Sequence, residues 1–181
     1  MSKDNEQDLI AACLRGDPKA QKSLYEKYSR IMFGVSLRYS NGYEEAKDIL
    51  QDGFVKVFTK LHQFSFSGSL EGWMKRIFIN TALEYYRVNK PYMNQSDVEA
   101  ADGNLHDDFT VERLSQKEIL EIMNEMATGY RNVLNLYIIE GYSHAEIAGM
   151  LKISEGTSKS QLSRARAILQ SEIIKRRKVR L

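Results

Sequence analysis

Five side chains between residues 159 and 166 have the chemistry of a nucleic-acid contact. Cations and hydroxyl groups donate hydrogen bonds to base edges and phosphate oxygens. The five residues are Lys159, Ser160, Ser163, Arg164 and Arg166. On a helix, Ser160, Ser163 and Arg164 share one side, and Lys159 and Arg166 flank it. Small, polar and basic groups gathered in this way predict binding to DNA.

A helix-turn-helix would position these side chains. Ser143 and Glu146 form an S-x-x-E capping box at the start of one helix, and Ser154 can cap the next. The inner face of the second helix is predicted from residues that repeat at helical spacing: Ser158, Leu162, Ala165 and Leu169. A second helix of this kind fits the major groove of DNA. An ordinary surface helical hairpin is the alternative.

A second group, between residues 64 and 90, mixes aromatic rings with cations. It contains Phe64, Phe66, Trp73, Phe78, Tyr85 and Tyr86 together with Lys75, Arg76, Arg87 and Lys90. Rings stack on unpaired bases while cations hold phosphates, so the group suits single-stranded nucleic acid. Trp73 shares an inward stripe with Ile77 and is expected to be buried. Lys75, Arg76 and Asn80 lie off that stripe and are the better candidates for contact.

A third group lies on a strongly periodic helix expected over residues 43–62. Its core face is predicted to contain Tyr43, Ala46, Leu50, Phe54, Val57 and Leu61. Asp48, Asp52 and Val55 point the other way, edged by Gln51 and Thr59. An apolar side chain between two carboxylates fits a docking surface for a basic partner. A solvated acidic face is the alternative.

Catalysis finds little support in the sequence. His62, His106 and His144 lie in different segments without the spacing of metal ligands. His144 follows the capping serine and is expected to face solvent. The chain has no glycine-rich phosphate loop and no nucleophile elbow. No catalytic residue, metal or other cofactor is therefore expected.

Composition favours a soluble protein of a reducing cytoplasm. Hydrophobic residues make up 43% of the 181 residues, which is enough for a buried core. Cys13 is the only cysteine, so an internal disulfide is excluded, and its apolar neighbours predict a buried thiol. No apolar run reaches the roughly 18 residues that span a bilayer, so direct membrane insertion is not expected.

Periodicity predicts an all-α protein of two small helical domains. The expected helices cover residues 8–15, 19–38, 43–62, 70–88, 115–126, 130–140, 143–151 and 155–174, followed by a frayed basic tail at 175–178. Residues 91–112 carry six acidic residues and no Lys or Arg, and periodicity lapses there. We interpret this segment as a flexible acidic linker between domains at 1–90 and 113–181.

These parts together resemble a bacterial RNA polymerase sigma factor of the extracytoplasmic-function (ECF) class. The resemblance covers about residues 5–175. Two segments carry it in combination: EEAKDILQDGFVKVF with the following loop, and the run from IEGYSHAEIA to ISEGT. It implies an alternative sigma factor that binds core polymerase and directs promoter-specific initiation. Such a protein is a specificity subunit, not an enzyme, and has no small-molecule substrate.

The resemblance also assigns roles to the three groups. Asp48, Gln51, Asp52 and Val55 would dock on the clamp helices of the polymerase's largest subunit. Capture of the melted −10 element would fall to Phe64, Ser65, Lys75, Arg76 and Asn80. The −35 element would be met by Lys159, Ser160, Ser163, Arg164 and Arg166. Further partners implied are the polymerase flap, promoter DNA and an anti-sigma factor, and the acidic linker would thread the polymerase's basic channels.

Two departures from the family pattern concern helix packing. Ala127-Thr128-Gly129 stands where Leu-Pro is usual, and Ser158 stands where Val is common.

The rival hypothesis is a free-standing helix-turn-helix regulator, which would bind a pseudo-palindrome as a dimer. It leaves Asp48, Asp52 and the acidic linker without a role. A small recombinase is a weaker rival, because the chain has no credible nucleophile or metal-binding carboxylate cluster.

Overall fold

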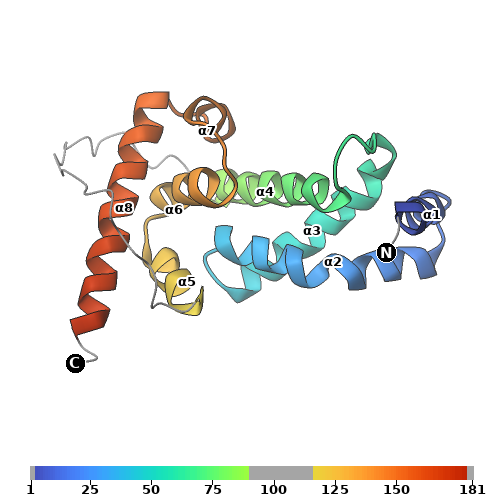
Figure 1. Ribbon diagram of the computed structural model, residues 1–181, viewed down its shortest axis with the longest axis horizontal. Coiled ribbons are helices and arrows are strands. Elements are labelled where there is room, and N and C mark those ends of the chain that lie inside the picture. The colour runs from blue at the N-terminus through green and yellow to red at the C-terminus, as the bar shows by residue number, and fades with distance from the viewer. Residues whose placement is uncertain (1–2, 90–115, 179–181) are drawn as a thin grey trace. The chain divides into compact units, whose positions relative to one another are not determined.

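The computed structural model describes residues 3–89 and 116–178, which fall into two compact helical units (Figure 1). Every regular element in these two ranges is a helix, so the predicted all-α fold class is confirmed. The predicted linker at 91–112 lies outside the described residues, and the domain limits drawn around it stay a prediction. Each unit is described separately below.

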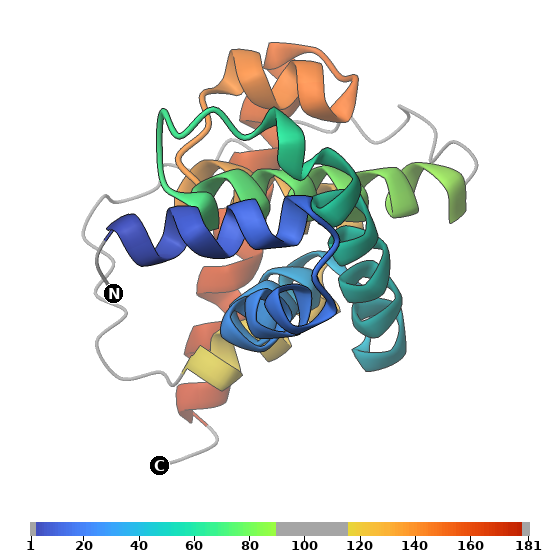
Figure 2. The ribbon, with the colours of Figure 1, turned by 90° about the vertical axis from the view of Figure 1, so that its right-hand side faces the viewer.

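Three long helices build the N-terminal unit. Its elements are α1 (Lys3–Leu14), α2 (Pro18–Tyr39), α3 (Tyr43–Lys60), the 3-10 turn η1 (Leu61–Gln63) and α4 (Leu70–Asn89). The helices α2, α3 and α4 pack pairwise against one another, and Figure 2 looks nearly along α2 with the other two beside it. Helix α2 begins cleanly because Pro18 occupies its first turn and the Asp17 carboxylate accepts from the Lys19 N–H at 2.9 Å.

The core of this unit depends on a close approach between α3 and α4. A Cβ on Gly53 would lie 2.3 Å from the ring of the fully buried Phe78, so only glycine leaves room for that ring. Phe54 then packs between Phe78 and Tyr25, at centroid distances of 5.3 and 4.6 Å.

The predicted core face of α3 was wrong at Tyr43, which is 61% exposed and packs edge-on against Phe33.

Helix α1 is held against α2 by a small polar cluster. The Glu6 carboxylate accepts from the Tyr28 hydroxyl at 2.9 Å and from the Lys27 ammonium at 3.3 Å. Ile10 and Cys13 fill the apolar contact behind it, which confirms the predicted burial of the thiol.

The C-terminal unit contains the predicted helix-turn-helix. Its elements are α5 (Gln116–Glu125), α6 (Thr128–Leu134), the π-helical turn η2 (Asn135–Ile139), α7 (His144–Leu151) and α8 (Glu155–Lys178). The capping box is confirmed, since Ser143 N–H donates to Glu146 Oε2 at 2.8 Å and Glu146 N–H donates to Ser143 Oγ at 3.3 Å. Lys152 ends α7 with a φ of 57°, a left-handed cap that turns the chain into α8.

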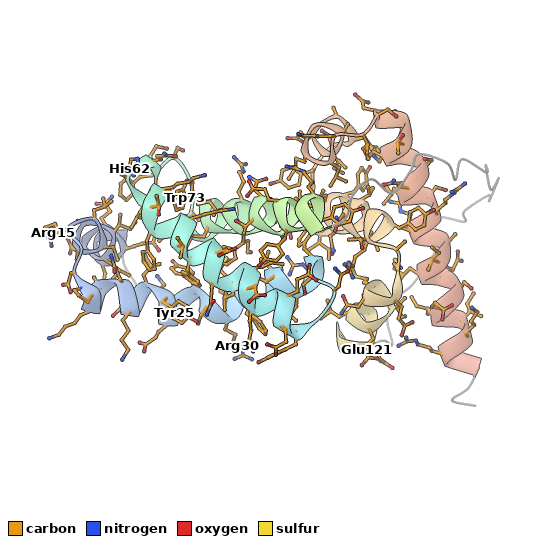
Figure 3. The ribbon with its side chains drawn as sticks, turned by 180° about the vertical axis from the view of Figure 1, so that it is seen from behind. Arg15, Tyr25, Arg30, His62, Trp73 and Glu121 are labelled. Atoms are coloured by element: carbon orange, nitrogen blue, oxygen red, sulfur yellow. The ribbon has the colours of Figure 1, made fainter. Side chains whose placement is uncertain are left out.

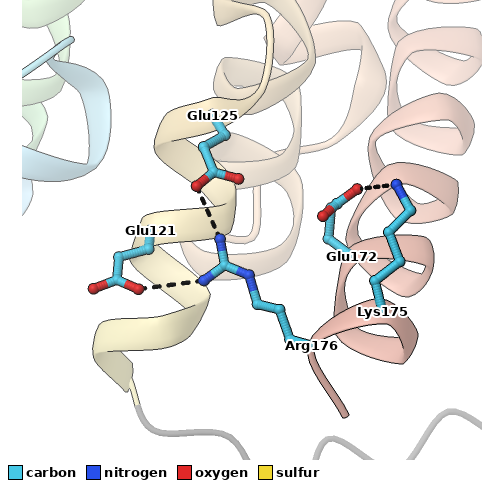
Figure 4. A network of polar contacts seen from close by, with 5 residues as sticks. All are labelled: Glu121, Glu125, Glu172, Lys175 and Arg176. Atoms are coloured by element: carbon cyan, nitrogen blue, oxygen red, sulfur yellow. Dashed lines mark hydrogen bonds and ion pairs between the residues drawn. The ribbon is translucent and has the colours of Figure 1, made fainter. Parts of the chain in front are cut away.

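The basic segment 175–178 was predicted to be a frayed tail, and this was wrong. Helix α8 continues through Lys178 because its last turns pack beside α5. Arg176 donates to Glu121 at 3.2 Å and to Glu125 at 2.9 Å, two carboxylates one helical turn apart, while Lys175 pairs with Glu172 at 2.6 Å (Figure 4). One guanidinium that binds two carboxylates in this way fixes the end of α8 to α5.

Candidate docking and nucleic-acid surfaces

The predicted docking residues share one exposed face of α3. Asp48, Gln51, Asp52 and Val55 follow a spacing that brings them to one side of the helix, and all four are exposed. Val55 is 64% exposed, which is unusual for a branched apolar side chain and fits a surface that a partner covers. We call these four residues the acidic α3 face.

The negative potential of the acidic α3 face reaches the neighbouring helix. Tyr85 of α4 has a pKa raised above its ordinary value, first by partial burial and then by the charges of Asp48, Asp52 and Glu45. These carboxylates disfavour a nearby phenolate because like charges repel. Lys56, on a flank of α3, forms an ion pair with Glu84 in which Nζ and Oε2 lie 2.6 Å apart. The described charges around this face therefore favour a cationic partner.

The loop at residues 64–69 presents a different ring from the one predicted. Phe64 is only 8% exposed and packs against Phe66 and Trp73, at centroid distances of 4.9 and 5.6 Å. Phe66 is 50% exposed and has a φ of 57°, which is rare for a residue with a side chain. Held backbone strain of this kind clusters at functional sites. The loop therefore offers the Phe66 ring on a platform of Phe64 and Trp73.

Helix α4 carries the predicted polar contacts beside this loop. Its first turn is capped by Ser69, whose Oγ accepts from the Gly72 N–H at 3.1 Å. Arg76 and Asn80 are exposed one turn apart, whereas Lys75 is half-buried and pairs with Glu71 at 2.7 Å. Trp73 was expected to be buried, but it is half-exposed at the end of the unit that also carries His62 (Figure 3). The fully buried stripe of α4 is instead Leu70, Met74 and Phe78.

The inner face of α8, the second helix of the helix-turn-helix, consists of the residues predicted for it. Ser158, Leu162 and Ala165 are buried, and Leu169 is half-buried. On the outer side Lys159, Ser160 and Arg166 are exposed.

Ser163 and Arg164 are less exposed than the helical spacing predicted. Arg164 was placed on the outer side, but its guanidinium donates to the Tyr130 hydroxyl of α6 at 3.3 Å. The long side chain leans toward α6 because a hydrogen-bond acceptor is within its reach there.

His144 is a residue whose contacts sequence reasoning missed. It was expected to face solvent, yet it is half-buried, and its Nδ1 lies 2.8 Å from the buried Ser158 Oγ. Its ring stacks on Tyr137 of η2 with a centroid distance of 4.6 Å. The capping-box pattern fixes where α7 begins, but it does not say which part of α8 lies over that first turn.

The described residues hold no group suited to a metal ion. Within residues 3–89 and 116–178, no three His, Cys, Asp or Glu side chains gather closely enough to bind one. In the same two ranges, no helix combines the length and the apolar character that crossing a bilayer requires.

Comparison with family models gives two matches. Residues 24–91 match the model of Sigma-70 region 2, and residues 116–169 match the model of Sigma-70, region 4. Together the two matches cover more than half of the chain and occur in this order along it. The first contains the acidic α3 face and the loop at 64–69, and the second contains the helix-turn-helix.

Similar proteins of known identity match over almost the whole chain. RNA polymerase sigma-H factor of Pseudomonas aeruginosa is 27% identical over 185 residues, which is 96% of each chain. The ECF RNA polymerase sigma factor SigW of Bacillus subtilis is 26% identical and covers 88% of this chain and 91% of its own. A similar fold is seen in sigma factor RpoE of Bartonella quintana, solved in complex with the anti-sigma factor NepR. That structure has a TM-score of 0.53 and 22% identity, and the match covers 83% of this chain and 94% of that one.

Proposed function

The chain belongs to the sigma-70 family of RNA polymerase sigma factors, and we propose that three of its surfaces divide polymerase docking and promoter recognition among them. It is an ECF-type sigma factor that binds core RNA polymerase and directs promoter-specific initiation, and it is a specificity subunit, not an enzyme. The observation that carries this function is the presence of region 2 and region 4 in one chain of 181 residues.

The acidic α3 face docks on core polymerase. Asp48, Asp52 and the exposed Val55 combine charge with apolar area, as the centre of an interface requires. Burial is the main cause of the raised pKa of Tyr85, and the nearby carboxylates add to it; their charge supports a basic partner, which we take to be the clamp helices of the largest subunit. The flap is the second polymerase contact that we assign to this protein.

The loop at 64–69 and helix α4 capture the melted −10 element. An extruded base needs a partner that recovers the unstacking cost of a few kcal/mol. Stacking on a protein ring supplies about 1–3 kcal/mol per base. Phe66 is the exposed ring, Phe64 supports it from below, and Ser65 and Asn80 supply polar contacts. Arg76, with Lys75 beside it, holds the backbone of the strand.

Helix α8 meets the −35 element as duplex DNA. Lys159, Ser160 and Arg166 are exposed for base or phosphate contact. Ser163 and Arg164 complete the surface, and the hydrogen bond to Tyr130 orients the Arg164 guanidinium beside the groove. Arg166 is assigned to a phosphate.

Membership of this family supports three further assignments. An anti-sigma factor is a fitting partner, since RpoE was solved in complex with one. The protein would act in the cytoplasm, beside the polymerase. The acidic segment 91–112 would follow the polymerase's basic channels, resembling nucleic acid in charge.

Run-off transcription with core polymerase and a library of genomic promoters tests the function. We expect transcripts that depend on both proteins and start downstream of a shared two-part sequence. Stoichiometric co-purification with core polymerase is the companion measurement. A chain that ignores polymerase and binds a pseudo-palindrome as a dimer would instead be the free-standing regulator.

A further inference from the structure

A polar contact joins the two helices of the helix-turn-helix. His144 is the first residue of α7, and Ser158 lies on the inner side of α8 with none of its surface exposed. The distance of 2.8 Å between His144 Nδ1 and Ser158 Oγ is that of a good hydrogen bond. Burying a hydroxyl without a hydrogen-bond partner is costly. The contact with His144 supplies that partner to Ser158, which is otherwise buried between helices.

The same histidine reaches the outer side of α8 through an aromatic ring. Its imidazole stacks on Tyr137 at 4.6 Å with the ring planes 25° apart. The guanidinium carbon of Arg166 lies 5.8 Å from the centroid of the Tyr137 ring, within the range of a cation–π contact. His144 therefore touches a residue on the inner face of α8 and supports the ring beside an exposed cation of its outer face.

We propose that His144 is a positioning residue for recognition of the upstream promoter element, an inference that rests on the proposed role of α8 in DNA binding. Through Ser158 it fixes how α8 lies on α7, because a hydrogen bond constrains distance and direction whereas apolar side chains can slide. Through Tyr137 it holds the Arg166 guanidinium ready for a phosphate. Contacts to base edges tolerate displacements of only about 0.5 Å, so the first effect acts on base preference, whereas the second acts on the phosphate contact of Arg166.

Two substitutions separate these effects. His144→Phe keeps an aromatic ring on Tyr137 and removes the nitrogen that meets Ser158. His144→Asn keeps a polar atom near the position of Nδ1 and removes the ring. Ser158→Ala removes the hydroxyl from the other side of the same bond. Ser171→Ala makes the same chemical change at an exposed position further along α8 and is the matched control.

The first measurement is base preference. Holoenzyme assembled from core polymerase and each variant selects open complexes from a promoter library in which the upstream and downstream elements are randomised separately. Loss of one hydrogen bond should reduce the upstream preference about threefold to tenfold in His144→Phe and in Ser158→Ala. The double variant should be no worse than either single one, because both changes remove the same bond. His144→Asn and Ser171→Ala should keep the preference, and no variant should change the downstream one.

The second measurement is the dependence of holoenzyme–promoter affinity on salt. Loss of one phosphate contact reduces the slope of log affinity against log salt by about one. We expect this reduction in His144→Asn, because the loss of the imidazole ring leaves Tyr137 without support beside Arg166. We do not expect it in His144→Phe, which keeps a ring there. In the expected result, His144→Phe loses base preference and His144→Asn has the smaller salt dependence. A general loss of stability would not divide the two effects between the variants in this way. Thermal unfolding of each variant checks this directly.

Parallel losses in the Phe and Asn variants, or an unchanged upstream preference in Ser158→Ala, would overturn the proposal. If wild-type holoenzyme itself shows no upstream preference, the assignment of α8 to DNA is wrong and the role of His144 falls with it. If the wild type shows the preference and the His144 and Ser158 variants keep it, only the role of His144 is wrong.

Discussion

At the scale of single residues, our proposal makes docking on the polymerase depend on the charge of two carboxylates. Replacing Asp48 and Asp52 together by lysine should weaken binding to core polymerase by at least about a hundredfold, because like charges facing each other cost several kcal/mol. The free energy of unfolding should hardly change, since both side chains are exposed. Titration calorimetry with core polymerase and thermal unfolding of the free chain give the two values.

Asp8→Lys is the matched control for the docking variant. Asp8 is an exposed acid of the same unit, on α1, so its reversal changes net charge without touching the acidic α3 face. It should leave the affinity for polymerase near that of the wild type. Unchanged binding in the Asp48 and Asp52 double variant would refute the docking face.

A second residue-scale prediction concerns Arg164 and its hydrogen bond to Tyr130. Arg164→Ala should relax preference in the upstream element by about 1–3 kcal/mol, the value of a specific arginine–base contact, and spare the downstream element. Tyr130→Phe removes only the hydroxyl that accepts from the guanidinium. It should change the upstream preference less than Arg164→Ala does, since the cation remains. Selection from randomised promoters measures both variants.

Two other results would redirect this assignment. Equal effects of Tyr130→Phe and Arg164→Ala would place the role of Arg164 in packing against α6 and not in a base contact. A change confined to the downstream preference would mean that the two DNA-binding modules had been assigned in reverse.

At the scale of elements, the packing of α3 on α4 predicts a large effect of one methyl group. Gly53→Ala should lower the free energy of unfolding by about 1–3 kcal/mol, the cost of overpacking a core, because the buried Phe78 ring occupies the space. Gly34→Ala, in α2, meets nothing within 4 Å and should raise stability by up to about 1 kcal/mol through helix propensity. Denaturant unfolding of both variants compares them. A stabilised Gly53→Ala would show that α4 can move away from α3.

The course of the helices could be predicted from the sequence, but the precise side that each one buries could not. Ile49 is fully buried and Tyr43 exposed because α2 and α4 both pack on α3, which broadens and turns the stripe that periodicity assigned. The segment 175–178 stays helical because Glu121 and Glu125 lie opposite Arg176, more than 50 residues away in sequence. Partners so distant leave no local pattern.

The candidate surfaces show the same division between local and distant information. Exposure of the acidic α3 face follows from helical spacing and was confirmed at all four positions. The burial of Phe64, the exposure of Phe66 and the partners of His144 depend on where a loop or a second helix returns. A φ of 57° at Phe66 is set by tertiary packing, since no glycine marks that position. Resemblance to a family supplied the roles, but not these contacts.

At the scale of the whole molecule, two DNA-binding modules on one chain gain strength when a third body fixes their separation. Each surface has only a few contacts, and two modules whose separation is not fixed gain only a modest effective concentration from being on one chain. In our proposal, core polymerase removes that freedom once the acidic α3 face has docked. The free chain should therefore bind promoter DNA weakly and with strong salt dependence, whereas the holoenzyme should bind it tightly.

Promoter spacing tests this division of labour. Inserting about 5 bp between the two elements turns the upstream one by half a helical turn, and about 10 bp restores the phase but adds about 34 Å. If polymerase fixes the separation, both insertions should reduce transcription to the level of a promoter without its upstream element. If the segment between the two modules fixes it, the longer insertion should recover activity, because that segment would then extend to the new separation while the DNA phase is restored. Run-off transcription from the unmodified promoter, the two insertions and a promoter without its upstream element measures the difference. Recovery at about 10 bp would assign the spacing to the chain instead of the polymerase.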